Sequence, residues 1–357
     1  MKVLLLDSYF GESHKTWAEG LKKFSKNHFE ILSLKPIHWK WRMQGGSISL
    51  AEKFNQSNFI PDVVLATSMV NLALFKSLAN INWLNTPCVL YFHENQLAYP
   101  FSKNDTDIIQ NRDNHYGFIQ YTSALIADEV WFNSNYNKDS FFQNLELLLK
   151  LMPKPNTFSK VQYLIEKSRV LSLGFEFPEV ELQKKKKKVK TILWNHRWED
   201  EKNPKEFLEA LEVIKQKGIE FKLIISGVKP EVANSDLLKF KNQIQYLGFV
   251  KSKEAYWQLL QESDIALVTS NQDFFGISVV EAIYAGCFPL LPKRLSYPEL
   301  FPNENFFYDD FTELVNKLEI ALESIELPNF RKLVSHLNWK QMIEHYDFAL
   351  ANLPNNN

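Results

Sequence analysis

Short apolar runs alternate with longer amphipathic segments along most of the chain. Each run has the length of a strand, and polar residues or a turn follow it. Strands that alternate with helices in this way predict parallel sheets covered by helices on both faces. The runs are 2–7, 62–67, 87–93, 129–134 and 169–175 in the first half, and 191–196, 221–226, 244–250, 264–270 and 287–292 in the second. We therefore predict an α/β fold with two doubly wound domains.

A charged segment, PEVELQKKKKKVK at 178–190, separates the two sets of strands. Its consecutive lysines repel one another and cannot pack together, so they predict a solvated linker. The alternative is that these lysines contribute to phosphate binding. We therefore predict two domains, 1–177 and 191–335, joined by this linker.

The last segment of the chain, 336–357, is predicted to be a return helix and tail, with an amphipathic helix over 336–350 that packs back on the body of the protein. Leu337, Met342, His345 and Phe348 have roughly helical spacing, which would place them on one buried face. The helix would return the chain from the second domain.

Composition and charge narrow the classes of function. The apolar fraction of 45% and the charged fraction of 23% are typical of a globular protein. The net charge of −1 argues against a broadly basic surface, so any polyanion must bind local patches. Cys88 and Cys287 form no Cys-x-x-Cys motif, which disfavours a zinc ribbon or a disulfide framework. The apolar opening before Asp7 is too short for a signal peptide, so we expect a cytoplasmic protein without stable membrane association.

The stretch NQDFFGISVVEA, 271–282, carries the first candidate site. It follows an apolar run, so it lies at the carboxyl end of a predicted parallel strand, where open α/β sheets bind ligands. Gly276 allows a ligand to approach closely, and the free N–H groups of a helix beginning near Ile277 attract an anion. Asp273 and Glu281 suit hydroxyl groups instead, one set on a ribose and another on a sugar.

A second cluster, WNHRWEDEKNP at 194–204, follows the first predicted strand of the second domain. Arg197 and Lys202 precede a helix that Pro204 would open, and together these cations can neutralise a diphosphate. The alternative is an exposed pair that forms salt bridges with the acidic residues between them. The DFFG stretch at another strand end of the same domain favours the diphosphate.

Polar clusters also follow three predicted strands of the first domain. DSYFGESHK places a turn at Gly11 before His14, which is either a weak phosphate loop or an ordinary helix start. YFHENQ places His93 where it can hydrogen-bond a sugar hydroxyl or a reacting centre, or serve as a structural histidine. Ser134 is expected to be a helix N-cap.

The segment LKPIHWKWRMQGGS, 34–47, combines basic and aromatic side chains. Such interleaving suits stacking on bases and pairing with phosphates. A half-buried edge strand with inward tryptophans explains the alternation equally well, and the sequence leaves both open. The residues concerned are Lys35, His38, Trp39, Lys40, Trp41 and Arg42.

The second-domain motifs resemble the donor site of the retaining family-4 glycosyltransferases. These enzymes have the GT-B fold, in which two Rossmann-like domains face each other across a cleft. In that family an Arg and a Lys hold the nucleotide diphosphate, which corresponds here to Arg197 and Lys202. The first acid contacts the sugar and the second receives the ribose hydroxyls. Asp273 and Glu281 occupy these places, although the first acid of the family is usually Glu.

A closer resemblance covers nearly the whole chain. The stretches FGESHK, HWKWRM, YFHENQLAYP, FNSNYN, WNHRWEDEKNP and DFFGISVVEA are similar to tRNA-queuosine α-mannosyltransferases. This resemblance implies transfer of mannose from GDP-mannose to the cyclopentenediol of queuosine at the wobble position of tRNA-Asp. The fold family binds its diphosphate with protein cations, which implies that no metal or other cofactor is required.

The residues and the resemblance together assign three groups of site residues. The catalytic group is His93, Arg197, Lys202 and Asp273. The donor-binding group is Gly11, His14, Arg197, Lys202, Phe275, Gly276, Ile277 and Glu281. The acceptor-binding group is Lys35, His38, Trp39, Lys40, Trp41, Arg42, Glu94, Asn95 and Gln96.

Two other functions stay open. One is a GT-B enzyme with another nucleotide sugar or with a lipid or polysaccharide acceptor. A membrane acceptor of that kind would prefer an apolar or basic amphipathic helix in the first domain, and none is clear. A tRNA-binding protein on a degenerate scaffold is disfavoured because Arg197, Lys202 and Glu281 are all present. The chain has no His-Glu-x-x-His, P-loop or Gly-x-Ser-x-Gly motif, which disfavours a zinc protease, an NTPase or a serine hydrolase.

Overall fold

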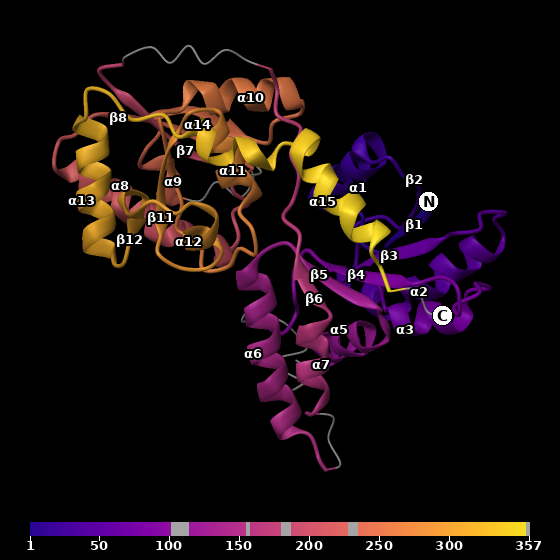
Figure 1. Cartoon of the computed structure of the whole chain (residues 1–357). Coiled ribbons are helices and arrows are strands. Elements are labelled where there is room, and N and C mark those ends of the chain that lie inside the picture. Colours follow the sequence, from indigo (N-terminus) through magenta and orange to yellow (C-terminus); the bar gives the residue numbers. More distant parts are fainter. Residues whose placement is uncertain (101–113, 155–157, 180–186, 228–234, 355–357) are drawn as a thin grey trace. The chain divides into compact units, whose positions relative to one another are not determined.

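The computed structural model describes residues 1–100, 114–154, 158–179, 187–227 and 235–354 (Figure 1). The chain divides into two compact units. Unit 1 comprises Met1–Glu176 and Leu337–Asn357, and unit 2 comprises Phe177–His336. The C-terminal segment therefore belongs to the same unit as the N-terminal half.

Unit 1 contains a six-stranded sheet in the order β2-β1-β3-β4-β5-β6. All neighbouring strands are parallel. The inner strands β3, β4 and β5 are buried along their whole length, as expected of a parallel sheet with helices on both faces. The strands are β1 (Lys2–Asp7), β2 (His28–Ser33), β3 (Val63–Thr67), β4 (Cys88–Phe92), β5 (Glu129–Phe132) and β6 (Ser168–Val170).

Helices cover both faces of this sheet (Figure 1). Helices α1 and α15 pack together on one face, where Trp17 of α1 stacks on Tyr91 of β4 with ring centroids 4.5 Å apart. Helices α2, α3 and α5 pack together over the other face, whose core includes Leu4, Leu6 and Phe54. The helices are α1 (Glu12–Phe24), α2 (Trp39–Asn55), α3 (Leu72–Leu78), α5 (His115–Ile126), α6 (Asn135–Leu151), α7 (Lys160–Glu166) and α15 (Trp339–Ala351).

Unit 2 repeats the architecture with a parallel sheet in the order β12-β11-β10-β7-β8-β9. Its core lies largely between this sheet and helices α8 and α13. The strands are β7 (Lys190–Trp194), β8 (Phe221–Ser226), β9 (Ile244–Gly248), β10 (Ile265–Leu267), β11 (Phe288–Pro292) and β12 (Phe307–Tyr308). The prediction of two doubly wound α/β domains is therefore confirmed.

The helices of unit 2 include one that begins at Pro204, as predicted. They are α8 (Pro204–Gln216), α9 (Ser235–Leu238), α10 (Lys253–Glu262), α11 (Ile277–Tyr284), α12 (Tyr297–Leu300), α13 (Phe311–Glu323) and α14 (Arg331–Val334). Short 3₁₀ helices are η1 (Asp200–Lys202), η3 (Glu304–Phe306) and η4 (Ser335–Leu337).

Every predicted apolar run contains a strand, but the sequence pattern missed two strands at sheet edges. Strand β2 is only partly buried, so its residues do not form a continuous apolar run. Strand β12 has two residues, too few to produce a pattern. Reduced burial thus hid β2 and short length hid β12, whose two residues are buried.

The C-terminal helix forms as predicted, and Leu337 and Met342 are buried as expected, but two residues assigned to the buried face are exposed. Phe348 is 68% exposed and His345 is also exposed. A period of 3.6 residues from Met342 leads to Tyr346 and then to Ala349, and the buried side chains follow that course. The buried face consists of Trp339, Met342, Ile343, Tyr346, Ala349 and Leu350.

The middle of the predicted Lys-rich linker, 180–186, lies outside the described residues. Lys187, near its end, has its Nζ 3.2 Å from Asp264 Oδ2. Lys190 is buried as the first residue of β7, so the sheet begins one residue before the predicted boundary.

Candidate active site

Two loops of unit 2 meet at the carboxyl ends of the adjacent strands β7 and β10. The backbone carbonyl of Glu201 accepts hydrogen bonds from the N–H groups of Asn271 (2.7 Å) and Gln272 (3.2 Å). Thr269 Oγ1 donates to the Lys202 carbonyl at 3.0 Å. The RWEDEK loop and the DFFG loop, separated in sequence, therefore form one structure.

Lys202 and Asp273 form an ion pair at the centre of this structure. Lys202 Nζ lies 3.1 Å from Asp273 Oδ2 and donates to the Gln272 carbonyl at 2.9 Å, and its side chain is only 13% exposed. Burial alone would raise the pKa of Asp273, but the Lys202 charge and hydrogen bonds to the carboxylate hold it below its ordinary value. Lys202 is thus an oriented cation beside a permanent anion.

Asp273 also fixes the DFFG loop. Its Oδ1 accepts the N–H groups of Gly276 (2.8 Å) and Phe275 (3.3 Å), and its Oδ2 accepts the hydroxyl of Tyr297 at 3.2 Å. A carboxylate with these partners holds the turn and aims Lys202. We therefore describe Asp273 as a positioning residue in this conformation, rather than as a free sugar ligand.

Gly276 is required by its backbone conformation. Its φ is 88°, and a Cβ there would lie 3.0 Å from the Tyr297 ring. Helix α11 begins at Ile277, as predicted. The first N–H groups of a helix have no intrahelical acceptor, so this end favours an anion next to Lys202.

Glu281 lies one turn into α11 and is the second acid of the pair. Tyr256 Oη donates to its Oε2 at 3.0 Å, and Asn195 Nδ2 donates to Tyr256 Oη at 3.1 Å. Burial raises the pKa of Glu281 to about 7, against the opposing effects of Tyr256 and Lys253. The group therefore changes charge near neutral pH.

Arg197 differs from Lys202. Its side chain is 63% exposed, with Nη1 3.1 Å from Glu199 Oε1 and Nη2 3.2 Å from Glu201 Oε1. These are the salt bridges that the sequence left as the alternative. The structure thus places Arg197 on the surface of the loop and Lys202 inside it.

His196, between these loops, was not predicted. Its side chain is buried, and Nδ1 lies 3.1 Å from Ser278 Oγ in the first turn of α11. Burial and the nearby Lys202 charge lower its pKa to about 3, so the ring is neutral. The available signal was a histidine directly before the predicted cation, in a loop already assigned to diphosphate.

Unit 1 has its own polar cluster at the carboxyl ends of β1 and β4. His14 Nδ1 lies 2.7 Å from Asp7 Oδ2, and His14 Nε2 lies 3.2 Å from Glu94 Oε2. Burial alone would lower the pKa of His14, but the two carboxylates raise it to about 10, so the ring is an imidazolium. No role was assigned to Asp7 from the sequence, although it is a carboxylate at the end of an apolar strand.

His93 stacks on His14 with ring centroids 4.1 Å apart. Burial and then the His14 charge lower the pKa of His93 well below its ordinary value, so this ring is neutral. Its Nε2 is buried without a hydrogen-bond partner among the described residues. Gly11, which precedes His14 in the chain, is the N-cap of α1 and has an ordinary φ of −82°.

Asn95, assigned to acceptor binding from the sequence, is engaged within unit 1 in this structure. The side chain is 0% exposed. Its Nδ2 donates to Asn137 Oδ1 at 2.8 Å, and its Oδ1 accepts the Ala98 N–H at 2.8 Å. Gln96 is also buried. Ser134 caps α6 by accepting the Asn137 N–H at 3.0 Å, as expected.

The basic and aromatic segment enters helix α2 at Trp39, with His38 as the N-cap and Lys35 before it, so the edge-strand alternative is wrong. Trp39 packs against Tyr116 with ring centroids 4.9 Å apart. Trp41 is 62% exposed, and its indole lies against Gly45, where a Cβ would be 2.8 Å from the ring. The two tryptophans therefore have different roles. Lys35 and His38 are exposed, and Lys40 and Arg42 are half-buried.

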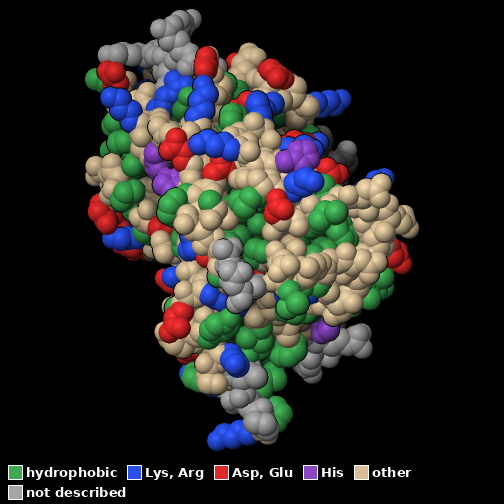
Figure 2. All heavy atoms as spheres, turned by 45° about the vertical axis from the view of Figure 1, so that its right-hand side comes forward, with side chains coloured by type: hydrophobic (Ala, Val, Ile, Leu, Met, Phe, Trp, Pro, Cys, Tyr) green, Lys and Arg blue, Asp and Glu red, His purple; other side chains and the backbone are tan. Residues whose placement is uncertain are grey.

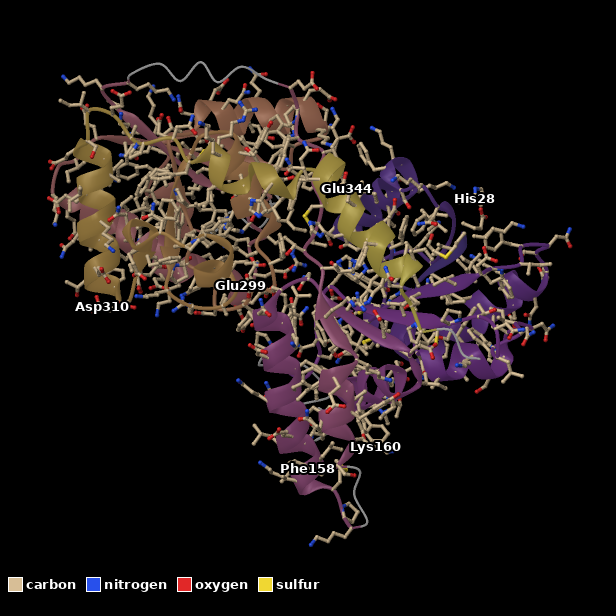
Figure 3. All side chains as sticks on the ribbon, viewed as in Figure 1. His28, Phe158, Lys160, Glu299, Asp310 and Glu344 are labelled. Atoms are coloured by element: carbon tan, nitrogen blue, oxygen red, sulfur yellow. The ribbon has the colours of Figure 1, made fainter. Side chains whose placement is uncertain are left out.

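Within the described residues, no group of three or more His, Cys, Asp or Glu is arranged to hold a metal ion. Asp310, labelled in Figure 3, caps α13 by accepting the Glu313 N–H at 2.9 Å.

None of the helices in the described part of the chain is long and apolar enough to span a membrane. Acidic and basic side chains are interspersed on the face drawn in Figure 2.

Comparison with known proteins connects both units to one family. Residues 2–175 match the family described as tRNA-queuosine alpha-mannosyltransferase N-terminal, and residues 178–331 match glycosyl transferases group 1. The tRNA-queuosine alpha-mannosyltransferase of Drosophila melanogaster is 30% identical over 333 residues, 88% of this chain and 85% of that protein. The chain belongs to the tRNA-queuosine α-mannosyltransferase family. It is a glycosyltransferase.

Other similarities of this family member are more distant. The GDP-mannose:cellobiosyl-diphosphopolyprenol alpha-mannosyltransferase of Xanthomonas campestris is 25% identical over 183 residues, 50% of this chain and 47% of that protein. The structure of Anabaena HepE in complex with UDP and glucose matches with a TM-score of 0.68 at 16% identity, covering 99% and 100% of the two chains. Sucrose-phosphate synthase from Thermosynechococcus elongatus matches with a TM-score of 0.69 at 12% identity, covering 99% of each chain. These structures show the GT-B fold.

Proposed function

We propose that this enzyme transfers mannose from GDP-mannose to queuosine at the wobble position of tRNA-Asp, with retention at the anomeric carbon. The observation that carries the proposal is the similarity to the Drosophila tRNA-queuosine alpha-mannosyltransferase, which extends over 88% of the chain and so includes both units. The name of the Xanthomonas relative supports GDP-mannose as the donor. A tRNA acceptor is consistent with a cytoplasmic enzyme that has no stable membrane association.

The geometry of unit 2 supports a nucleoside diphosphate sugar as the donor. Lys202 and the first turn of α11 offer positive charge to the diphosphate, and Glu281 offers a carboxylate to the ribose hydroxyls. Arg197 would join them by exchanging its exposed pairs with Glu199 and Glu201 for a phosphate, because exposed ion pairs are weak.

The same cations support a transfer without a metal. As the bond between the anomeric carbon and the diphosphate oxygen breaks, GDP leaves with the electron pair, and its charge is stabilised by groups already in place. The acceptor hydroxyl then forms the new bond to the anomeric carbon on the same face. Its proton passes to the departing phosphate oxygen, so no separate base is required.

The neutral His93 of unit 1 suits a hydrogen bond to a sugar hydroxyl. Its unpartnered Nε2 accepts or donates without changing charge, since the ring stays neutral beside the His14 imidazolium. His14 and Glu94 act on the sugar through His93, because their polar atoms already bind each other.

The acceptor surface is assigned to the start of α2. Trp41 presents an exposed indole for stacking on a base of the anticodon loop, and Lys35, Lys40 and Arg42 supply charge for phosphates. Trp39 supports the helix by packing on Tyr116.

A lipid-linked acceptor is the second candidate, because the acceptor named for the Xanthomonas relative is a diphosphopolyprenol. One experiment separates the two. The protein is incubated with labelled GDP-mannose, or with another labelled nucleotide sugar, and with queuosine-containing tRNA, queuosine-lacking tRNA or polyprenol diphosphate sugars. Mannosyl-queuosine detected by mass spectrometry of digested nucleosides is the expected result. Label in the lipid alone contradicts the tRNA acceptor, and no transfer from GDP-mannose with transfer from another nucleotide sugar contradicts the donor.

A further inference from the structure

His196 has a buried ring nitrogen that no group of the protein satisfies. His196 is only 4% exposed, and its Nε2 has no hydrogen-bond partner among the described residues. Leaving a buried polar atom without a partner costs about 1–3 kcal/mol, so such an atom in a functional loop requires an explanation.

One contact orients the ring and two others hold the backbone of His196. Nδ1 lies 3.1 Å from Ser278 Oγ, and the His196 carbonyl accepts the indole N–H of Trp194 at 3.0 Å. Gly227, with a φ of 89°, passes so close that a Cβ there would lie 2.9 Å from the His196 carbonyl oxygen. The orphan nitrogen is therefore part of a prepared arrangement and not a consequence of a loose loop.

The surroundings of the ring identify the missing partner. Ser278 lies in the first turn of α11, the helix end that favours an anion, and the charges that act on His196 are those of Lys202 and Asp273. Because the ring is neutral, one nitrogen donates and the other accepts. When the Ser278 hydroxyl donates to Nδ1, Nε2 carries the proton. Nε2–H then requires a hydrogen-bond acceptor, and a phosphate oxygen is one.

We propose that His196 binds the donor directly, through a hydrogen bond from Nε2–H to a diphosphate oxygen of the nucleotide sugar. This inference rests on the proposed donor function and adds a residue to it. Ser278 acts as a positioning residue that holds Nδ1, and its hydroxyl donates to Nδ1 when Nε2 carries the proton. The neutral ring adds a directional donor to the site without adding charge to that of Lys202.

Two substitutions distinguish this role from packing. His196→Gln places an amide near the position of Nε2, and His196→Asn places one near the position of Nδ1. GDP affinity is measured by calorimetry at a fixed pH, together with the melting temperature of each unliganded variant. Loss of one hydrogen bond to a charged group predicts about 10- to 100-fold weaker GDP binding for His196→Asn. His196→Gln is expected to stay close to the parent protein.

Equal GDP affinity for both variants and the parent protein would overturn the role of His196 while leaving the donor proposal intact. Failure of the parent protein to bind GDP, with binding of UDP or ADP, would instead overturn the choice of donor. If the variants do not fold, ¹⁵N NMR of the parent protein decides. On addition of GDP the His196 resonances should show protonated Nε2 with a new hydrogen bond, and unchanged resonances at saturation contradict the proposal.

Discussion

The rings of His14 and His93 are stacked with centroids 4.1 Å apart, and their pKa values shift in opposite directions. The difference arises from their neighbours. Asp7 and Glu94 both bind His14, whereas no carboxylate is hydrogen-bonded to His93 in the described part of the chain. One ring is thus a cation, while burial and then the charge of that cation keep the other ring neutral.

Replacing Asp7 by Asn should destabilise the protein by removing the nearer anion from His14. A hydrogen bond to a charged group contributes about 1.5–3 kcal/mol, which sets the expected loss near neutral pH. The folded pKa of His14 is about 10 against an ordinary value of 6.5. Its stabilising effect is therefore complete below pH 6.5 and is lost as pH rises toward 10. Urea unfolding of both proteins across this range should give a difference that shrinks with rising pH, and a constant difference would contradict the assignment.

Lys202→Ala should lower kcat/KM by about 10²- to 10³-fold, because a buried cation that stabilises the leaving diphosphate is removed. Arg197→Ala should lower it as well, by a comparable factor if Arg197 turns to the phosphate. The control is Lys205→Ala, since the Lys205 side chain is 85% exposed and pairs with Glu209 across one helical turn. Initial rates are measured with queuosine-containing tRNA at subsaturating donor. Near-normal turnover of Lys202→Ala excludes its proposed role.

GDP-mannose binding should become tighter as pH rises through about 7, because the carboxyl group of Glu281 has its pKa raised to about 7. Above this pH the group is ionised and accepts hydrogen bonds from two ribose hydroxyls, while below it one oxygen is protonated. The diphosphate diester itself does not titrate near neutrality. Glu281→Gln should bind more weakly and lose this pH dependence in calorimetry. A variant that keeps the parent pH profile would show that another group is responsible.

The two tryptophans of α2 should respond differently to alanine. Trp41→Ala removes an exposed indole, and if that indole stacks on a base, tRNA binding weakens by about 1–3 kcal/mol with an unchanged melting temperature. Trp39→Ala removes a ring packed on Tyr116 and should lower the melting temperature. KM for tRNA and thermal unfolding are measured for both. Unfolding caused by Trp41→Ala would favour packing over stacking at that position.

Addition of EDTA should leave the initial rate almost unchanged. The proposal assigns neutralisation of the diphosphate to Lys202, Arg197 and the first turn of α11, so no step depends on a divalent cation. Rates are compared in buffer treated with chelating resin, with and without added magnesium. A large loss that magnesium restores would show that a metal participates, although tRNA folding must be followed separately by its own melting curve.

Much of the fold and part of the site could be predicted from the sequence. Apolar runs report burial directly, and the carboxyl ends of parallel strands meet at one edge of a sheet. The DFFG and RWEDEK stretches were therefore expected to lie together, and Pro204 and Ile277 were found at the predicted starts of their helices.

The tertiary structure decided how each of these side chains is used. Lys202 turns inward because Asp273 and the Gln272 carbonyl bind it, while Arg197 stays with Glu199 and Glu201 outside. Local sequence does not determine this choice, since both cations stand in the same loop and the partner of Lys202 comes from another strand end.

The same reason explains why the contacts of other residues were not predicted. Asn95 stands in a polar cluster that predicted a site, but its side chain is hydrogen-bonded to Asn137. His196 is identified only in the structure, where Ser278 contacts Nδ1 and Nε2 has no partner among the described residues. The spacing of apolar residues, which indicates strands and helices, is a property of the local sequence and can be read from it. The partner of a polar atom depends on three-dimensional contacts between distant segments, and only the folded structure supplies it.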